Sequence, residues 1–90
     1  MSYQVKLSPH ALRQYKKLAP AIKPQIQTAL DSLQHHLPAG TKVKRLRGRL
    51  SEYYRYRMED YRIIFTISHK ERVVYVDFID HRRQAYRDIE

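Results

Sequence analysis

The sequence predicts a small α+β fold in which two helices pack against a mainly antiparallel sheet. Its first third carries apolar residues at helical spacing, whereas its second half contains three strand-like runs. The chain has 90 residues, of which 42% are apolar, and a chain of this length buries a little over ~60% of its unfolded surface. We therefore expect residues 1–90 to form a single domain with one modest core.

A short strand and two helices are expected first. The segment YQVKL, residues 3–7, alternates as a strand does. Ser8 followed by Pro9 is typical of a helix start, because a capping hydroxyl precedes a proline at the first helical position. Two apolar stripes at helical spacing follow, separated by the helix-breaking pair AP at residues 19–20. They consist of Ala11, Leu12, Tyr15 and Leu18 in one helix, and of Ile22, Ile26, Ala29, Leu30 and Leu33 in a longer helix antiparallel to it.

Three further strands are expected in the second half. The segment LPAG at residues 37–40 ends the second helix. The strand-like runs are YYRYRM, YRIIFTI and RVVYVDFI, at residues 53–58, 61–67 and 72–79. The remaining segment HRRQAYRDIE, residues 81–90, is expected to form a short C-terminal helix or tail.

Composition excludes several classes of site. The chain has no cysteine, so a disulfide framework, a thiolate metal site and a cysteine nucleophile are all absent. Its five histidines lack the spacing to carboxylates that a metal site requires, so we expect no metal and no cofactor. Nothing resembles a signal peptide or a membrane span, and we therefore expect a soluble, cytoplasmic protein without a membrane partner.

The charge of the chain indicates an anionic partner. The net charge is +9 and the pI is about 10.0. Residues 42–62 hold eight basic side chains against three acidic ones, so +5 of the +9 lies there. The basic residues are Lys42, Lys44, Arg45, Arg47, Arg49, Arg55, Arg57 and Arg62, and the acidic ones are Glu52, Glu59 and Asp60.

Strand geometry predicts that three of these arginines form a cluster. Side chains alternate between the faces of a strand, so Arg55 and Arg57 share a face. A turn centred on Glu59 and Asp60 places Arg57 opposite Arg62 on that face. A further turn at SHKE, residues 68–71, then places Asp77 opposite Arg62. In this register the side chains that face the helices are Ile63, Phe65, Val74, Val76 and Phe78.

The predicted cluster is better suited to binding than to folding. Like charges directly opposite each other destabilise a sheet, by a few tenths to ~1 kcal/mol, whereas a polyanion would be attracted by them. The alternative is a solvated outer face on which Asp77, Glu59 and Asp60 neutralise scattered arginines.

The C-terminal segment carries a second group of candidate residues. Helical spacing in HRRQAYR would place Arg82 and Tyr86 on one face, and Arg83 and Arg87 on the next. A guanidinium can bind phosphate oxygens in a forked geometry while a tyrosine ring stacks on an unpaired base. The alternative is that Tyr86 packs the segment onto the sheet.

Several segments resemble a known family. The order of elements, RLRG, the strand YYRYRMEDYRIIF and the ending DHRRQAYR are similar to the RelE/ParE superfamily of bacterial toxins from type II toxin–antitoxin systems. Resemblance to the RelE branch implies a ribosome-dependent endoribonuclease that cleaves mRNA in the ribosomal A site and so inhibits translation. It implies catalytic roles for Arg55, Arg57, Arg62, Arg82 and Tyr86. RNA or ribosome binding would fall to Lys42, Lys44, Arg45, Arg47, Arg49 and Arg83.

The same resemblance implies partners besides the ribosome and mRNA. An antitoxin, expected to be acidic, would wrap the basic surface, and the toxin–antitoxin complex would bind operator DNA. Two alternatives stay open for the activity. The ParE branch has the same architecture but inhibits DNA gyrase, and a non-catalytic domain would hold RNA without cutting it.

The general base of an RNA cleavage reaction is unassigned. Cleavage requires a 2′-hydroxyl to attack the adjacent phosphate, with charge stabilisation and proton transfer. Well-known members of the family have lysines where Arg55 and Arg57 stand, and arginine is a poor base because it stays protonated. Histidine is the residue type best suited to proton transfer near neutral pH, so His81 is a candidate, although a lone histidine at a strand end is more often a surface residue.

Overall fold

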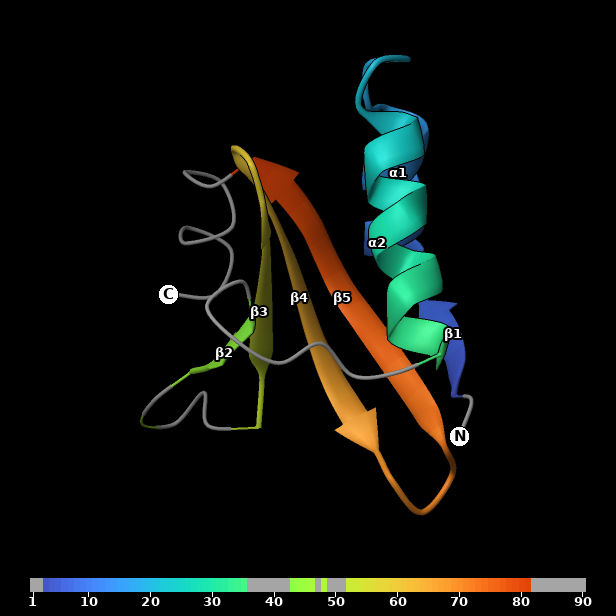
Figure 1. Cartoon of the computed structure of the whole chain (residues 1–90), viewed down its shortest axis with the longest axis vertical. Helices are drawn as coiled ribbons and strands as arrows, with labels where there is room; N and C mark the ends of the chain where they lie inside the picture. Colours follow the sequence, from blue (N-terminus) through green and yellow to red (C-terminus); the bar gives the residue numbers. More distant parts are fainter. Residues whose placement is uncertain (1–2, 36–42, 47, 49–51, 82–90) are drawn as a thin grey trace.

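The structure, a computed structural model, describes residues 3–35, 43–46, 48 and 52–81. In chain order its elements are β1 (Gln4–Leu7), α1 (Pro9–Lys16), α2 (Lys23–His35), β2 (Val43–Arg45), β3 (Tyr54–Met58), β4 (Tyr61–Ser68) and β5 (Val73–His81). The strands form one twisted sheet in the order β1-β5-β4-β3-β2, and both helices lie on one side of it (Figure 1).

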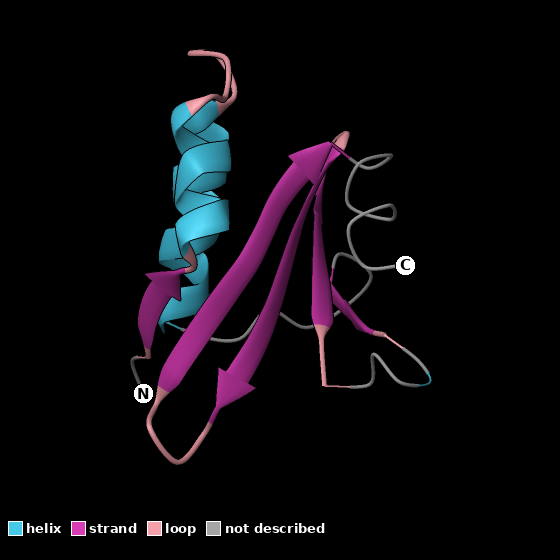
Figure 2. Cartoon of the chain, turned by 180° about the vertical axis from the view of Figure 1, so that it is seen from behind, coloured by secondary structure: helices cyan, strands magenta, loops and turns pink. Residues whose placement is uncertain are grey.

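The expected α+β fold is confirmed. The N-terminal strand, the two helices and the three later strands all form, and every neighbouring strand pair is antiparallel except β1 with β5. The structure adds the short strand β2, which the sequence did not predict and which pairs with β3 at the edge of the sheet (Figure 2). The expected C-terminal helix or tail lies outside the described residues.

Ser8 joins the start of α1 to β5. Its Oγ accepts a hydrogen bond from the Ala11 backbone N at 3.0 Å, which caps the helix, and Pro9 stands at the first helical position as predicted. The same hydroxyl donates to the Asp77 carbonyl at 3.0 Å, and the Ser8 backbone N donates to the Val76 carbonyl at 2.8 Å. The helix cap and the strand are therefore held by one residue.

The hydrophobic core lies between the helices and one face of the sheet. Its most deeply buried members are at most 1% exposed. They are Ala11, Ile26, Ala29 and Leu33 from the helices, and Ile63, Phe65, Val74, Val76 and Ile79 from β4 and β5. The predicted helix-facing residues are thus confirmed except for Phe78, whose place in the core is taken by Ile79.

A β-bulge in β5 explains this exchange. Phe65 pairs with Val76 but Ile64 pairs with Phe78, so Asp77 is an extra residue on β5. After the bulge, Phe78 shares with Ile64 the sheet face that is turned away from the helices, and Ile79 returns to the core. The prediction for Phe78 was wrong because strict alternation cannot anticipate an inserted residue.

Asp77 also interacts with Tyr53, the residue before β3. The negative charge of the Asp77 carboxylate raises the pKa of the Tyr53 hydroxyl above its ordinary value of 10.0. Partial burial, a hydrogen bond to Asp77 and the charge of Glu52 act in the same direction. The neutral phenol is therefore the form that the fold favours.

Within the described residues, neither helix is long and apolar enough to cross a membrane.

A pair of leucines on the two helices tests the packing. Leu33 is 1% exposed and Leu12 is 44% exposed. We expect Leu33→Ala to lower the free energy of unfolding by about 2–5 kcal/mol, because it leaves a cavity in the core. The control Leu12→Ala should change it by about 0.5 kcal/mol or less. Urea denaturation of both variants measures the difference, and equal effects would contradict this description of the core.

The Tyr53 contact predicts a pH dependence at alkaline pH. Because the pKa of Tyr53 is raised in the folded state, its contribution to stability is fully present below pH 10 and is lost as the pH rises through the folded pKa. Between pH 9 and 11, approximately the range around this ordinary pKa, wild-type stability should fall more steeply than that of Tyr53→Phe. Asp77→Asn should also flatten the wild-type slope, and three identical slopes in urea denaturation would refute the assignment.

Candidate functional site

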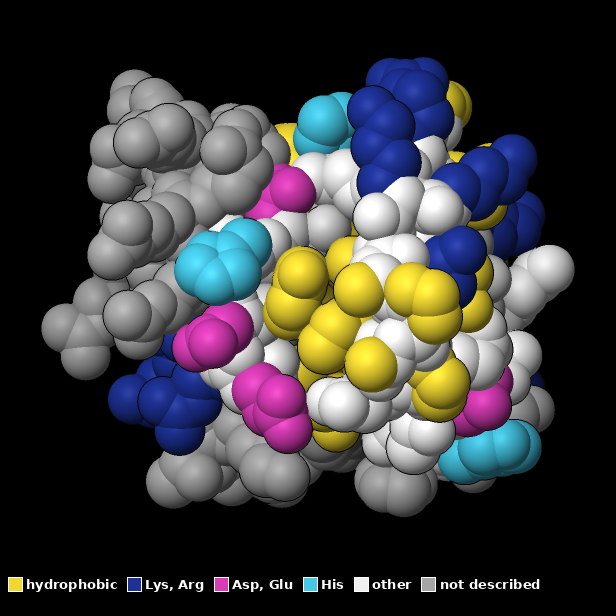
Figure 3. Space-filling model, turned by 90° about the horizontal axis from the view of Figure 1, so that it is seen from above, with side chains coloured by type: hydrophobic (Ala, Val, Ile, Leu, Met, Phe, Trp, Pro, Cys, Tyr) yellow, Lys and Arg dark blue, Asp and Glu magenta, His cyan; other side chains and the backbone are white. Residues whose placement is uncertain are grey.

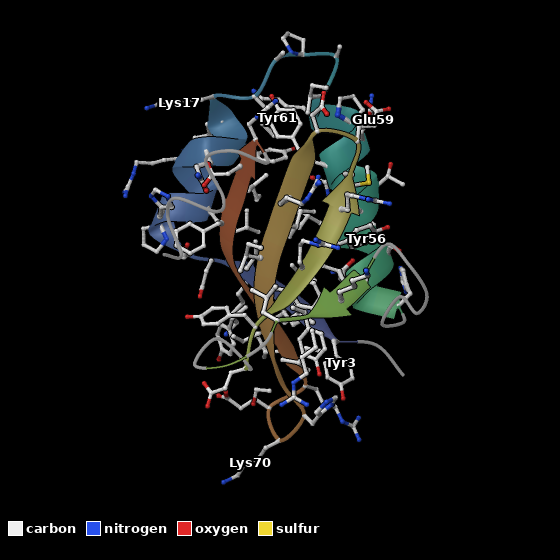
Figure 4. All side chains as sticks on the ribbon, turned by 90° about the vertical axis from the view of Figure 1, so that its left-hand side faces the viewer. Tyr3, Lys17, Tyr56, Glu59, Tyr61 and Lys70 are labelled. Carbon is white, nitrogen blue, oxygen red and sulfur yellow. The ribbon has the colours of Figure 1, made fainter. Side chains whose placement is uncertain are left out.

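The candidate site lies on the sheet face turned away from the helices, called here the outer face. Figure 4 looks onto this face, with the helices behind the sheet. Strand register places Lys44 of β2, Arg55 of β3, Ile64 of β4 and Phe78 of β5 in one row across it. Lys44 is exposed, Arg55 is half-buried and Ile64 is buried. The basic end of this row therefore lies at the β2 and β3 side of the sheet.

A second row lies nearer the hairpin between β3 and β4. Arg57 is opposite Arg62, as predicted, and the turn between the strands consists of Glu59 and Asp60. The residue opposite Arg62 on β5 is Asp80, so the prediction of Asp77 was wrong. The β4–β5 turn lies one residue later than expected, at residues 69–72, which moves the partner on β5 by two positions, and the bulge moves it by one more.

The two opposed arginines have different environments. Arg57 is exposed, whereas Arg62 and Asp80 are each only 7% exposed. The Arg62 Nη1 donates to the carbonyls of Glu59 and Tyr61, both at 3.0 Å. Glu59 has a positive φ of 53°, which is uncommon for a residue with a side chain. Arg62 therefore braces a strained turn, and Arg57 is the member of the pair that faces solvent.

Gln14 of α1 completes the second row. Its Oε1 accepts a hydrogen bond from the Ile79 backbone N at 2.8 Å, and its Nε2 donates to Asp80 Oδ1. Strand β1 pairs with β5 only as far as Val76, so Gln14 binds the edge of β5 where no strand covers it. The side chain thereby fixes the position of Asp80 opposite Arg62.

The structure unites some of the predicted site residues and separates others. Arg55, Arg57, Arg62 and Lys44 share the outer face, while Arg45 pairs with Tyr54 and so points to the other side. His81 pairs with Tyr61, next to the Arg62–Asp80 pair, and therefore also lies on the face opposite to the arginines. The other predicted residues lie outside the described part of the chain: Lys42, Arg47, Arg49, Arg82, Arg83 and Tyr86.

The surroundings of the arginines were only partly foreseen. Asp77 contacts Tyr53, while Glu59 and Asp60 are exposed at the tip of the hairpin beside Arg57. Sequence patterns gave no signal for Gln14 or Asp80, because their roles depend on the register of β5. Among the described residues, no group of three or more histidine, aspartate or glutamate side chains could hold a metal ion.

Chemically, the outer face offers permanently charged guanidinium groups without an assigned base. Arginine binds phosphate oxygens through up to two parallel hydrogen bonds and stays protonated at neutral pH. An anion held by Arg57 would lie next to the buried Arg62, whose charge adds to the local positive potential. The arrangement is suited to binding a phosphate and to stabilising additional negative charge on its oxygens.

Comparison with solved structures identifies the fold. The chain is similar to a structure of the toxin–antitoxin complex RelBE2 from Mycobacterium tuberculosis, with a TM-score of 0.79 and 25% identity over 91% of this chain and 100% of the other. A mutant of the E. coli toxin RelE in the free state gives a TM-score of 0.78 and 20% identity over 100% and 94% of the two chains. A YoeB/ParE toxin from Agrobacterium tumefaciens gives a TM-score of 0.74 and 13% identity over 87% of this chain and 96% of the other.

Comparison of sequences identifies the family. No match was found among curated proteins. A family model described as the ParE toxin of the type II toxin-antitoxin system parDE matches residues 5–86, which includes every strand and helix described above except the first residue of β1. The chain therefore belongs to the ParE toxin family, within the RelE/ParE superfamily of type II toxin–antitoxin systems.

Proposed function

We propose that this toxin inhibits translation by cleaving mRNA in the ribosomal A site, as a metal-independent endoribonuclease. The observation that supports this proposal is the grouping of an exposed Arg57, a half-buried Arg55 and an exposed Lys44 on one sheet face, with the buried Arg62 behind the hairpin turn. Like charges in register weaken a sheet, and an anionic substrate bound on this face would offset that repulsion.

The proposed chemistry is cleavage of RNA by its own 2′-hydroxyl. The hydroxyl attacks the adjacent phosphorus, the bond to the 5′-oxygen breaks, and a 2′,3′-cyclic phosphate and a free 5′-hydroxyl result. Arg57 and Arg55 would bind the phosphate oxygens and stabilise the extra charge of the phosphorane. Arg62 is held by the turn carbonyls, so it would stabilise the phosphate through its electrostatic field and would not contact it directly.

The remaining roles fall to residues outside the described part of the chain. We assign Arg82 to stabilisation or protonation of the leaving 5′-oxygen, and Tyr86 to stacking on a base of the cleaved codon. Lys42, Arg47, Arg49 and Arg83 would add phosphate contacts. His81 lies on the other sheet face, so we leave it out of the mechanism. Alignment and charge stabilisation then supply most of the rate enhancement.

We further propose that a cognate antitoxin neutralises this toxin. The similar structures include toxin–antitoxin complexes from M. tuberculosis and from Pyrococcus horikoshii. A net charge of +9 favours an acidic partner that covers the outer face. Operator DNA would be bound only by the toxin–antitoxin complex.

Inhibition of DNA gyrase is the second candidate function. It is favoured by one specific observation, the match of residues 5–86 to a model of ParE toxins. In that case the exposed arginines would contact gyrase rather than RNA.

A primer-extension assay distinguishes the two functions. The isolated toxin is added to a defined mRNA in a purified translation system, with and without ribosomes. We expect cuts in the A-site codon only when ribosomes are present, and we expect Arg57→Gln to lower the cleavage rate about 100-fold or more, as loss of a transition-state hydrogen-bond donor does. Arg82→Ala and Tyr86→Ala should also abolish cleavage.

The control variant is Lys70→Gln, an exposed residue in the β4–β5 turn, which should cleave like wild type. Intact mRNA with folded wild-type toxin, together with inhibition of gyrase supercoiling, would replace the nuclease proposal with the gyrase one.

A stability measurement tests the division of roles between the two arginines. Arg62→Gln should lower the free energy of unfolding by about 3 kcal/mol or more, because it removes a buried charge that faces Asp80. Arg57→Gln should leave it within about 0.5 kcal/mol of wild type. Adding Asp80→Asn to Arg62→Gln should recover part of the loss. Similar losses for both single variants would show that Arg57 is structural as well.

A further inference from the structure

Helix α1 carries a group of basic side chains that the outer face does not include. Arg13 and Lys16 of the helix and Lys17, its C-cap residue, are all exposed, and their spacing of three and four residues places them on one side of the helix, called here the α1 stripe. Figure 3 shows Lys and Arg side chains gathered along one side of the molecule at this end, and Lys17 points away from the sheet in Figure 4.

The charge of this stripe is unbalanced. Residues 1–30 contain five basic residues and no aspartate or glutamate. The basic residues are Lys6, Arg13, Lys16, Lys17 and Lys23. In the described part of the chain no carboxylate pairs with the three side chains of the stripe. Cations in the last turn of a helix interact favourably with the helix dipole. Like charges three and four residues apart repel each other, however, so helix stability alone does not account for three basic residues here.

The chemistry of the stripe points to phosphates. The apolar residue Ala11 of α1 and Leu18, just after the helix, are buried in the core and cannot insert into a membrane. Leu12 is the one large apolar side chain exposed among the described residues, which is too little for the apolar centre of a protein interface. The stripe has no aromatic ring for stacking on bases. Flexible cations without an aromatic or apolar anchor fit the sequence-independent backbone of duplex RNA.

The stripe is separate from the outer face. Gln14, on the neighbouring side of α1, binds Asp80 at the edge of β5, and β5 and β4 lie between α1 and the arginines of β3. Two strand spacings of about 4.8 Å each separate β5 from β3 within the sheet, and the sheet itself separates the stripe from Arg57 on the outer face. One RNA segment on the outer face and another on the stripe can therefore bind together.

We propose that the α1 stripe binds the phosphate backbone of folded ribosomal RNA while the outer face engages the mRNA. The identity of this RNA rests on the proposed ribosome-dependent cleavage. The stripe then determines how tightly the toxin binds the ribosome, and the outer face determines how fast the bound toxin cuts.

The test compares two triple variants of equal charge. The first, Arg13→Gln/Lys16→Gln/Lys17→Gln, removes the stripe. The second, Lys6→Gln/Lys70→Gln/Arg72→Gln, removes three exposed charges elsewhere and controls for net charge. Cleavage kinetics on programmed ribosomes should show KM raised about tenfold or more for the stripe variant and kcat within about twofold of wild type, with a change below about twofold for the control. Arg57→Gln should instead lower kcat.

Direct binding to a 20-base-pair RNA duplex separates this inference from the proposed function, because it needs no ribosome. The stripe variant should lose duplex affinity, and the slope of log Kd against log salt should fall by about 2–3, which corresponds to three lost phosphate contacts. Wild-type affinity and slope in the stripe variant would overturn the inference, even if cleavage is observed. So would a loss confined to antitoxin binding, which would make the stripe a protein-binding surface. If the wild-type toxin does not cleave mRNA but the stripe variant still loses duplex affinity and salt slope as expected, only the proposed function is refuted.

Discussion

The extra residue in β5, Asp77, determines which side chains reach each face of the sheet. Before it, Val74 and Val76 face the core, and after it Ile79 does. Without this bulge the next alternation would turn Ile79 outward and Asp80 toward the helices, where an ionised carboxylate would be costly. The position of Asp80 opposite Arg62, and hence the whole second row of the outer face, depends on one inserted residue.

Helix α1 supplies the backbone partners that the bulged strand needs. Strand β1 pairs with β5 only up to Val76, so beyond Val76 the edge of β5 that is turned away from β4 has no strand beside it. The Ser8 hydroxyl donates to the Asp77 carbonyl, and the Gln14 side chain accepts from the Ile79 N. The residue that caps the helix and a residue nearly two turns later therefore protect the open edge of β5. Because Gln14 also binds Asp80, the position of the helix and that of the candidate site are coupled.

The elements of this fold were largely predictable, whereas the register was not. Ser8-Pro9 and the apolar stripes identified both helices, and the Glu59-Asp60 turn gave the correct pairing of Arg57 with Arg62. Short-range rules apply in these cases, since a cap or a two-residue turn is determined by adjacent residues.

The errors arose where a distant contact decides the structure. The bulge at Asp77 is stabilised by Ser8, which is 69 positions earlier, and no local pattern reports this contact. Strand β2 has only three residues and exists because β3 offers an edge. The burial of Arg62 could not be predicted from the sequence either. Alternation shows which face of the sheet a side chain occupies, but not whether other atoms cover that side chain.

Burial gives the same residue type two different tasks on adjacent strands. A buried guanidinium is held by fixed acceptors, as Arg62 is by the Glu59 and Tyr61 carbonyls, and it lies opposite the buried Asp80 on the neighbouring strand. An exposed guanidinium such as Arg57 keeps its donors available for a ligand. The two arginines can therefore stand side by side because the hairpin turn holds Arg62 in place. The pair is suited to phosphate because Arg57 is exposed and can bind a ligand.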